Sequence, residues 1–235
     1  MNEDLENIKF SLHNSEEITD VKHNPVVKVT MLSWLKLIPV LGELIDDTVD
    51  EVLLKFQKGK RNELLNIILS DSENITTDMV NDVEFIMSFR KTIEAIDRLA
   101  SNDKVIYFGN LLKNGYLKKD KIQLDKFDEY FYAINSLSRR QLFLLALLYS
   151  YSTKDILCED KKEIELKRWM LYQEEACNIC SLTEGELTSV LKSAEKSGLC
   201  KEFVGSMYGY KGGRFEATSM LSDFVAFVIS KNSGI

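Results

Sequence analysis

The stretch that decides the fold is Ser138–Tyr151, which reads Ser-Arg-Arg-Gln-Leu-Phe-Leu-Leu-Ala-Leu-Leu-Tyr-Ser-Tyr. Ser138 followed by Gln141 is a capping box, in which each residue satisfies a backbone N–H group that the first helical turn leaves unpaired. From Leu142 to Tyr149 the residues are apolar on every face, so a helix here must be surrounded by other elements. It is too short to span a bilayer. The sequence therefore predicts a central core helix of a soluble domain.

The composition favours a mainly helical protein. The 235 residues include only two prolines and eleven glycines, and few helix-breaking residues are typical of helical chains. The formal net charge is −7, which argues against a large sequence-independent affinity for nucleic acid or anionic lipid. Residues 1–25 form a polar acidic arm with a net charge of −4.

The chain is expected to be cytoplasmic. Its N-terminus is acidic and lacks the basic and apolar regions of a signal peptide, and four cysteines in a chain of this length are typical of reduced thiols. The most apolar N-terminal stretch, Val26–Ile45, is interrupted by Lys28, Lys36 and Glu43. A spanning helix needs about 20 residues with few or no charges, so we predict no integral membrane segment.

Residues 26–137 are predicted to form a helical bundle. Apolar residues recur at three- and four-residue steps from Pro39 to Ser70, where Gly59 marks a hinge in one long helix. Thr77 is expected to cap a second helix, Ser101 a third that Asn114-Gly115 ends, and Asp125 opens a fourth. The second helix carries a heptad-like stripe, which favours self-association as a homodimer: Val83, Ile86, Phe89, Ile93, Ile96 and Leu99.

Residues 138–235 are predicted to form a winged helix-turn-helix-like module that shares the central helix 138–151 with the bundle. A charged helix, Lys161–Ile179, precedes a helix at 184–197 that Ser181 or Thr183 caps and Gly198 ends. Two strands then flank a glycine-rich turn, and a helix closes the chain. These last elements are expected at Leu199–Val204, Gly205–Gly213, Arg214–Thr218 and Ser219–Ser230.

A winged helix suggests DNA binding, and the basic side chains that would contact DNA are Lys192, Lys196, Lys211 and Arg214. Charge weighs against this function. Residues 181–218 carry five basic and five acidic side chains, whereas a DNA-binding surface is usually basic. A structural or protein-docking role is therefore the preferred interpretation of the module.

No catalytic or cofactor site is expected. Cys177 and Cys180 form a CxxC pair that, with Cys158 and Cys200, would complete a four-thiolate zinc site, but no second closely spaced pair exists and ordinary half-buried cysteines fit better. The glycine-rich turn that ends at Arg214 suits a hairpin tip better than a phosphate loop, because it lacks a strand–loop–helix context. The two histidines, His13 and His23, lie in the polar arm, so no nucleophile–base pair is apparent.

The run Met31–Gly42 is unusually apolar for its place in the chain. It is best explained as a helix that packs against the bundle. Exposed, it would bind a partner or lie on a membrane surface through Trp34, Leu35 and Leu41.

Three stretches resemble a known family in their order and spacing: Ile38–Ile45, Ser101–Asn114 and Tyr130–Tyr149. They are similar to the abortive-infection alpha proteins, helical proteins of bacterial and phage accessory genomes. A Leu-Thr-x-x-Gly-like run before the last helix of that family is matched loosely by Glu216–Leu221, in which the glycine is missing. The resemblance implies a non-catalytic component of phage defence that acts through protein contacts.

The leading hypothesis is thus a cytoplasmic, non-enzymatic helical interaction or regulatory protein of phage defence. A winged-helix transcriptional regulator is the first alternative. A membrane-surface effector that uses residues 26–45 is the second.

Overall fold

The computed structural model describes residues 49–70, 75–76, 78, 81–118, 121–156, 160–204 and 212–229. The fold is mainly helical with one small antiparallel sheet near the C-terminus, which confirms the predicted fold class at this level. Its helices and strands are α3 (Val49–Leu69), α5 (Val83–Asp97), α6 (Val105–Tyr116), α7 (Leu124–Ser136), α8 (Arg139–Ser152), α9 (Lys161–Cys180), α10 (Glu184–Ala194), the 3₁₀ turn η4 (Glu195–Ser197), β1 (Cys200–Glu202), β2 (Phe215–Ala217) and α11 (Ser219–Val228).

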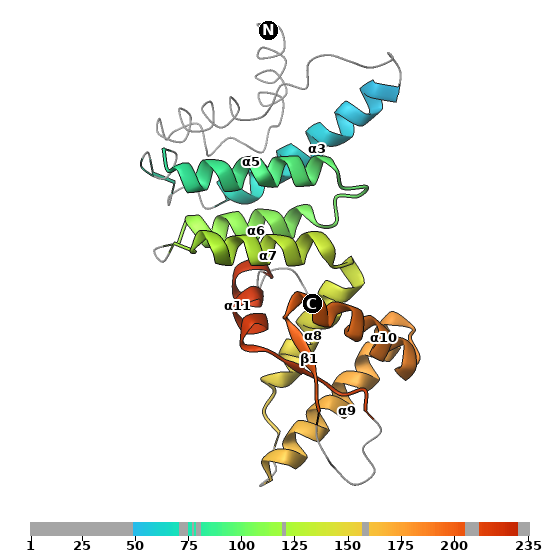
Figure 1. The fold of residues 1–235 in the computed structure, drawn as a ribbon. Coiled ribbons are helices and arrows are strands. Elements are labelled where there is room, and N and C mark those ends of the chain that lie inside the picture. Colours follow the sequence, from blue (N-terminus) through green and yellow to red (C-terminus); the bar gives the residue numbers. More distant parts are fainter. Residues whose placement is uncertain are drawn as a thin grey trace, which may run out of the picture.

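The helices stack along one axis (Figure 1). Helices α3 and α5 lie beyond α6 and α7 at one end, and α8 leads from α7 to α9, α10 and the sheet at the other. Helix α11 returns to pack against both α6 and α8. None of the described helices is long and apolar enough to cross a membrane.

The central helix α8 forms as predicted. Both hydrogen bonds of the capping box are present: the Gln141 backbone N–H donates to the Ser138 hydroxyl, and the Ser138 N–H donates to the Gln141 side chain. Leu142, Leu144–Leu148 and Tyr151 are all buried. The Gln141 amide also donates to the Ser193 hydroxyl over 2.6 Å, so the same cap ties α8 to α10.

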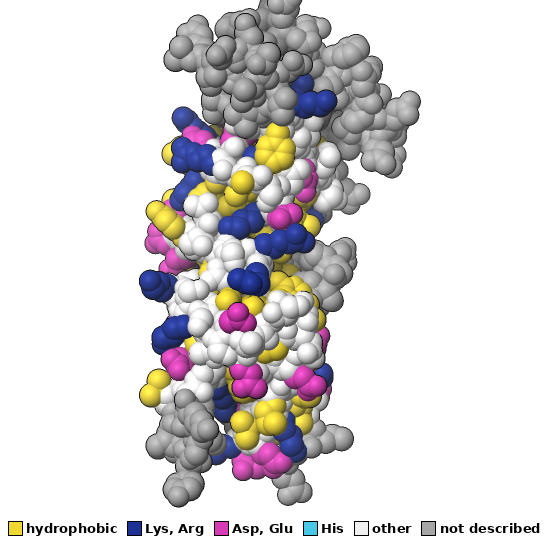
Figure 2. Space-filling model, turned by 90° about the vertical axis from the view of Figure 1, so that its right-hand side faces the viewer, with side chains coloured by type: hydrophobic (Ala, Val, Ile, Leu, Met, Phe, Trp, Pro, Cys, Tyr) yellow, Lys and Arg dark blue, Asp and Glu magenta, His cyan; other side chains and the backbone are white. Residues whose placement is uncertain are grey.

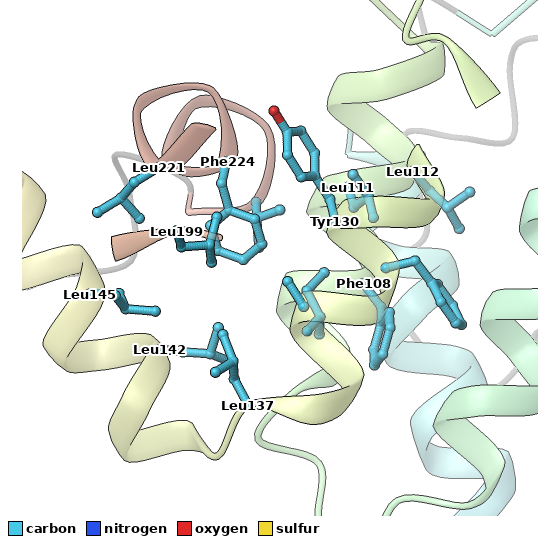
Figure 3. Packing of buried hydrophobic residues seen from close by; sticks show 14 of the residues in the cluster. Phe108, Leu111, Leu112, Tyr130, Leu137, Leu142, Leu145, Leu199, Leu221 and Phe224 are labelled. Carbon is cyan, nitrogen blue, oxygen red and sulfur yellow. The ribbon is translucent and has the colours of Figure 1, made fainter. Parts of the chain in front are cut away.

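One connected apolar core runs from α3 to α11 and crosses the predicted boundary at residue 137. Figure 3 shows side chains of α6 and α7 facing those of α8 and α11. The Tyr130 and Phe224 rings meet edge to face with centroids 5.6 Å apart, and Phe108 lies 5.1 Å from Phe131. Because buried aromatic pairs contribute beyond their area, the two ends of the molecule stabilise each other.

The C-terminal helix is held by two buried amides of α6. Asn110 donates from Nδ2 to the Val228 carbonyl over 3.0 Å, and Asn114 donates to the Phe227 carbonyl over 2.8 Å. The last carbonyls of a helix lack partners within it, so the two asparagines satisfy the end of α11. This corrects the prediction that Asn114-Gly115 ends its own helix: α6 continues to Tyr116, and Gly115 leaves room for Ile122, whose Cγ2 would lie 2.8 Å from an added Cβ.

Helix α5 begins later than the sequence predicts. Its N-cap is Asp82, whose carboxylate accepts a hydrogen bond from the Glu84 N–H group, whereas Thr77 lies outside the described residues. Three residues of the predicted stripe, Phe89, Ile93 and Ile96, are fully buried, but Val83 is 70% exposed. The buried face of α5 also includes Phe85, Ser88 and Thr92, which the predicted stripe omits. Phe85 packs on the ring of Tyr116, and the Ser88 hydroxyl is hydrogen-bonded to the Tyr116 hydroxyl.

Helix α6 begins at Val105, and Ser101 does not cap it, which corrects a second start signal. The N-cap residue is Lys104, which makes no side-chain capping bond there. Its ammonium group instead donates to the Ile134 carbonyl at 2.9 Å and the Asn135 carbonyl at 3.2 Å. A cation at a helix C-terminus is favourable, so Lys104 stabilises the end of α7.

Helix α3 is one continuous helix through Gly59, as the long-helix prediction expects, and shows no break at the predicted hinge. The next residue, Lys60, is fully buried and donates to the Leu99 carbonyl at 2.8 Å and the Asp97 carbonyl at 3.2 Å. Burial lowers the pKa of Lys60, while the nearby Asp97 opposes this effect. Arg61 adds an ion pair of 2.6 Å to Asp97. These bonds fix α3 to the end of α5.

Replacing Gly59 by alanine is expected to stabilise the protein. Gly59 is exposed, and an added Cβ would meet nothing within 4 Å. Alanine in a helix interior is favoured over glycine by about 0.5–1 kcal/mol. The free energy of unfolding, measured by urea titration, should rise by that amount.

The matched control is Gly109→Ala in α6. There an added Cβ would lie 2.8 Å from Cγ2 and 3.1 Å from Cβ of Ile67, so the same change should lower the free energy of unfolding by overpacking the α3–α6 contact. Equal effects of the two substitutions would contradict the placement of α3 against α6.

The sheet is a single antiparallel pair, in which Cys200 lies opposite Ala217 and Glu202 opposite Phe215. It is shorter than the two predicted strands. Gly198 ends the preceding turn in the left-handed conformation, with φ of 76°, as predicted. Residues 205–211, which include most of the predicted glycine-rich turn, lie outside the described residues.

Candidate functional site

The surface around α10 is where the sequence places a DNA or protein contact. Thr183 and Glu186 form a second capping box, and Ser181 adopts the left-handed conformation that ends α9. The chain therefore turns sharply from α9 into α10 within the three residues Ser181–Thr183. This part of the site follows from local sequence signals alone.

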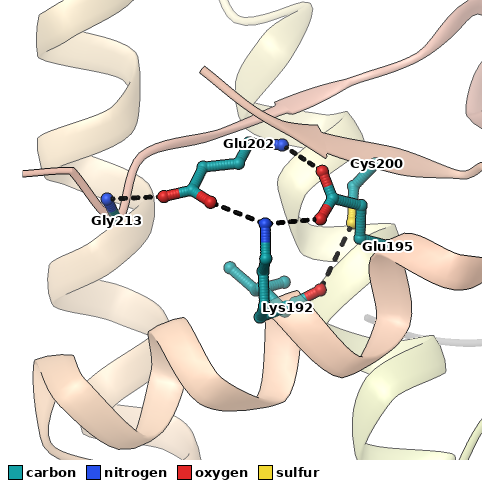
Figure 4. Close-up of polar contacts among 6 residues, drawn as sticks. Lys192, Glu195, Cys200, Glu202 and Gly213 are labelled. Atoms are coloured by element: carbon teal, nitrogen blue, oxygen red, sulfur yellow. Dashed lines mark hydrogen bonds and ion pairs between the residues drawn. The ribbon is translucent and has the colours of Figure 1, made fainter. Parts of the chain in front are cut away.

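Lys192 is engaged in a polar cluster at the base of the sheet (Figure 4). Its ammonium group lies 2.8 Å from Glu195 and 2.7 Å from Glu202. Glu195 also accepts a hydrogen bond of 2.9 Å from the Glu202 N–H group, and Glu202 accepts one of 3.2 Å from the Gly213 N–H group. The cluster thus joins α10, η4, β1 and Gly213, which lies two residues before β2.

Lys192 has two carboxylate partners, so this cluster keeps one excess negative charge. Hydrogen bonds from Lys192 hold the pKa values of Glu195 and Glu202 below the usual range, and the two carboxylates raise the pKa of Lys192. Because the folded-state carboxyl pKa values are lowered, the contribution to stability is present above the unfolded value of about 4.3. It is lost as the pH falls through the lower folded-state values.

Arg214 is buried rather than presented to solvent. Its side chain is only 6% exposed, and Nη2 lies 3.2 Å from Glu165 and 2.9 Å from Glu216. The guanidinium group also lies 4.5 Å from the centre of the Phe203 ring. Arg214 therefore joins α9 to the sheet, and its positive charge is paired with carboxylates of the same chain.

The remaining DNA candidates give no basic surface among the described residues. Lys196 is exposed, and Lys211 lies outside the described part of the chain. The exposed side chains at the start of α10 are Glu184 and Glu186, next to which a phosphate would be repelled. On the face drawn in Figure 2, basic and acidic side chains intermix.

Exposed apolar side chains lie on α9 instead. Leu166 is 42% exposed, Met170 59% and Ile179 56%. Leu166 and Met170 line a cleft of about 420 Å³ with Trp169 of the same helix and Phe203 beyond β1. Exposed apolar side chains of this kind are typical of protein contacts rather than of phosphate binding.

The cysteines do not gather into a metal site among the described residues, where no cluster of three metal-binding side chains is found. Cys177 and Cys180 lie in the last turn of α9, and Cys200 lies in β1. Cys158 lies outside the described residues.

Cys200 is expected to resist alkylation in the folded protein. It is 1% exposed, and burial raises its pKa to about 12. Since the thiolate is the reactive form, labelling by iodoacetamide at pH 8 should be slower than that of an unperturbed thiol by about 10³-fold or more. Peptide mass spectrometry after native and denatured labelling measures this ratio for Cys200.

The internal control is Cys177, which is only half-buried, so it should be labelled before Cys200. Burial raises its pKa as well, but Cys177 is more accessible to the reagent than the fully buried Cys200. Rapid native labelling of Cys200 would contradict the packing of β1 against α10.

Two other predicted surfaces, the apolar N-terminal run and the acidic arm, belong to residues that the structure does not describe. Trp34, Leu35 and Leu41 of the apolar N-terminal run lie outside the described residues, as does the acidic arm. The self-association stripe is largely used within the chain, since Phe89, Ile93 and Ile96 are fully buried. Of the stripe, Val83 is still exposed.

Comparisons of the chain with protein-family profiles, with curated protein sequences and with solved structures found no match.

Proposed function

We propose that this chain is a non-enzymatic, cytoplasmic interaction protein whose C-terminal unit, α8–α11 with β1 and β2, is a winged-helix-like module that docks a protein. The order of three helices, a two-stranded hairpin and a closing helix supports the winged-helix comparison. The observation that carries the docking role is that the positive charges of Lys192 and Arg214 are paired with carboxylates within the module, and are not presented to a nucleic acid.

The same observation disfavours DNA binding. Contacts to phosphates need cations that are free to release counterions, and two of the four candidate side chains already have carboxylate partners. The acidic residues Glu184 and Glu186 occupy the end of α10 that would face DNA in a helix-turn-helix. Leu166 and Met170 on α9 offer an apolar surface for a protein partner.

The setting we propose is phage defence. It is supported by the resemblance of three stretches of the sequence to the abortive-infection alpha proteins. Deleting the gene from its native host should raise the plating efficiency of at least one phage, and a variant that has lost its partner contact should behave like the deletion. Full restoration of defence by that variant would contradict the proposal.

The docking role can be tested by affinity purification of the tagged chain from its native host. The double variant Leu166→Glu and Met170→Glu should lose a specific co-purified protein by at least tenfold, because burying a charge in an apolar contact is costly. Met87→Glu on α5, where the side chain is also 58% exposed, is the control and should retain it. Nuclease treatment should change nothing; retention that requires nucleic acid would favour the DNA alternative.

A further inference from the structure

A second cavity, of about 200 Å³, lies between α8, α9 and β2 and shares Trp169 and Arg214 with the cleft beside Leu166 and Met170. It is open to solvent on one side and is lined by both aromatic and charged side chains. Those that matter below are Tyr151, Glu165, Arg168, Trp169, Tyr172 and Glu216.

The apolar part of this cavity is aromatic. The Trp169 ring lies 5.3 Å from Tyr172 and 6.4 Å from Phe215, and Tyr151 lies 6.3 Å from Tyr172. The Tyr151 hydroxyl donates to Glu175, which fixes that ring at the rim. A surface of packed rings favours an apolar, and best a planar, group of a ligand.

The lining includes two carboxylates that share one cation. Glu165 and Glu216 share one nitrogen, Nη2, of the buried Arg214. Both carboxylates are partly exposed, at 38% and 29% of their side chains. Two carboxylates on one guanidinium leave one negative charge for a bound cation to neutralise.

Arg168 of α9 also lines the cavity. Arg168 donates from Nε to the Lys154 carbonyl over 2.8 Å, which orients its side chain. In the part of the chain that the structure describes, its two terminal amino groups have no hydrogen-bond partner. A planar guanidinium presents these donors in the geometry that a carboxylate accepts.

We propose that this cavity binds a small zwitterion with an aromatic side chain, such as a free aromatic amino acid. Its carboxylate accepts hydrogen bonds from the terminal amino groups of Arg168. Its ammonium group pairs with Glu165 and Glu216, and its ring lies on Trp169. The proposal adds an effector site and does not depend on the docking role.

Isothermal titration calorimetry on the full chain tests the proposal with L-phenylalanine up to about 10 mM. N-acetyl-L-phenylalanine removes the ammonium charge and L-phenylalaninamide removes the carboxylate, so each should bind at least tenfold more weakly. Arg168→Gln should weaken L-phenylalanine binding at least tenfold, with Arg168→Lys intermediate because it keeps the charge but not the fork of donors. The control Arg90→Gln, at a 60% exposed side chain on α5, should bind as the wild type does.

Thermal unfolding shows whether each variant is folded before it is titrated. Three results would overturn the proposal: no heat of binding with any of the three ligands, equal binding of the blocked and free amino acids, or undiminished binding by folded Arg168→Gln protein.

Discussion

Replacing Arg214 by methionine is expected to destabilise the protein by about 2–3 kcal/mol. The substitution leaves Glu165 and Glu216 beside each other without their shared cation. Breaking a fully buried ion pair costs about 3–5 kcal/mol, and the partial exposure of both carboxylates reduces that figure. Urea unfolding followed by circular dichroism measures the change in the free energy of unfolding.

The control for this prediction is Lys201→Met on β1. Its side chain is exposed, and β1 pairs with β2, the strand that carries Glu216. Its effect should stay within about 0.5 kcal/mol. The triple variant in which Glu165, Glu216 and Arg214 all become methionine should recover part of the loss, because an apolar replacement of a whole ion cluster is often neutral. An Arg214→Met protein as stable as the wild type would contradict the role of Arg214 in holding α9 to the sheet.

Replacing both Asn110 and Asn114 by alanine is expected to lower the free energy of unfolding by about 2–5 kcal/mol. Both residues are buried, at 3% and 7% exposure, and the change leaves two carbonyls of α11 without their donors. An unsatisfied buried acceptor costs about 1–3 kcal/mol. Hydrogen exchange should show that α11 loses protection before the rest of the core.

Asn178→Ala is the matched control, because Asn178 is exposed on α9 and makes no side-chain hydrogen bond among the described residues. It should be neutral or slightly stabilising, since alanine is the better helix former. Equal effects of the double variant and this control would contradict the docking of α11 on α6.

Local signals in the sequence are enough to predict much of the fold. The capping boxes at Ser138 and Thr183 start their helices where predicted, and Gly198 ends the 184–197 segment. Each of these depends on residues no more than three positions apart, so spacing alone identifies them. The sequence also predicts the buried face at α7, because Phe127, Tyr130, Phe131, Ile134 and Leu137 repeat at helical steps, and all five are buried.

Long-range contacts decide the features that the sequence does not reveal. Asn114-Gly115 has the composition of a helix stop, but Asn114 bonds a carbonyl 113 residues away and Gly115 makes room for Ile122. Arg214 resembles a free cation beside a glycine-rich turn, yet one of its partners is Glu165, 49 residues away. No local pattern announces either pairing, since hydrogen-bond partners across a fold are set by tertiary packing.

The charge of the C-terminal unit is predictable from the sequence only in part. Counting residues 181–218 predicts a neutral module, and the structure adds that Lys192 and Arg214 have carboxylate partners. The aromatic cavity beside Arg168 could not be foreseen, because its walls come from α8, α9 and β2.

The most direct test of a protein-docking rather than a DNA-binding module is fluorescence anisotropy of a labelled DNA duplex titrated with the full chain. It should be done at about 50 mM and about 200 mM salt, the range over which phosphate contacts change affinity most visibly. We predict no binding at either salt concentration beyond that of an equally acidic control protein. Binding at low salt that falls steeply at high salt, and that is lost in Lys192→Glu and Lys196→Glu variants, would contradict the account.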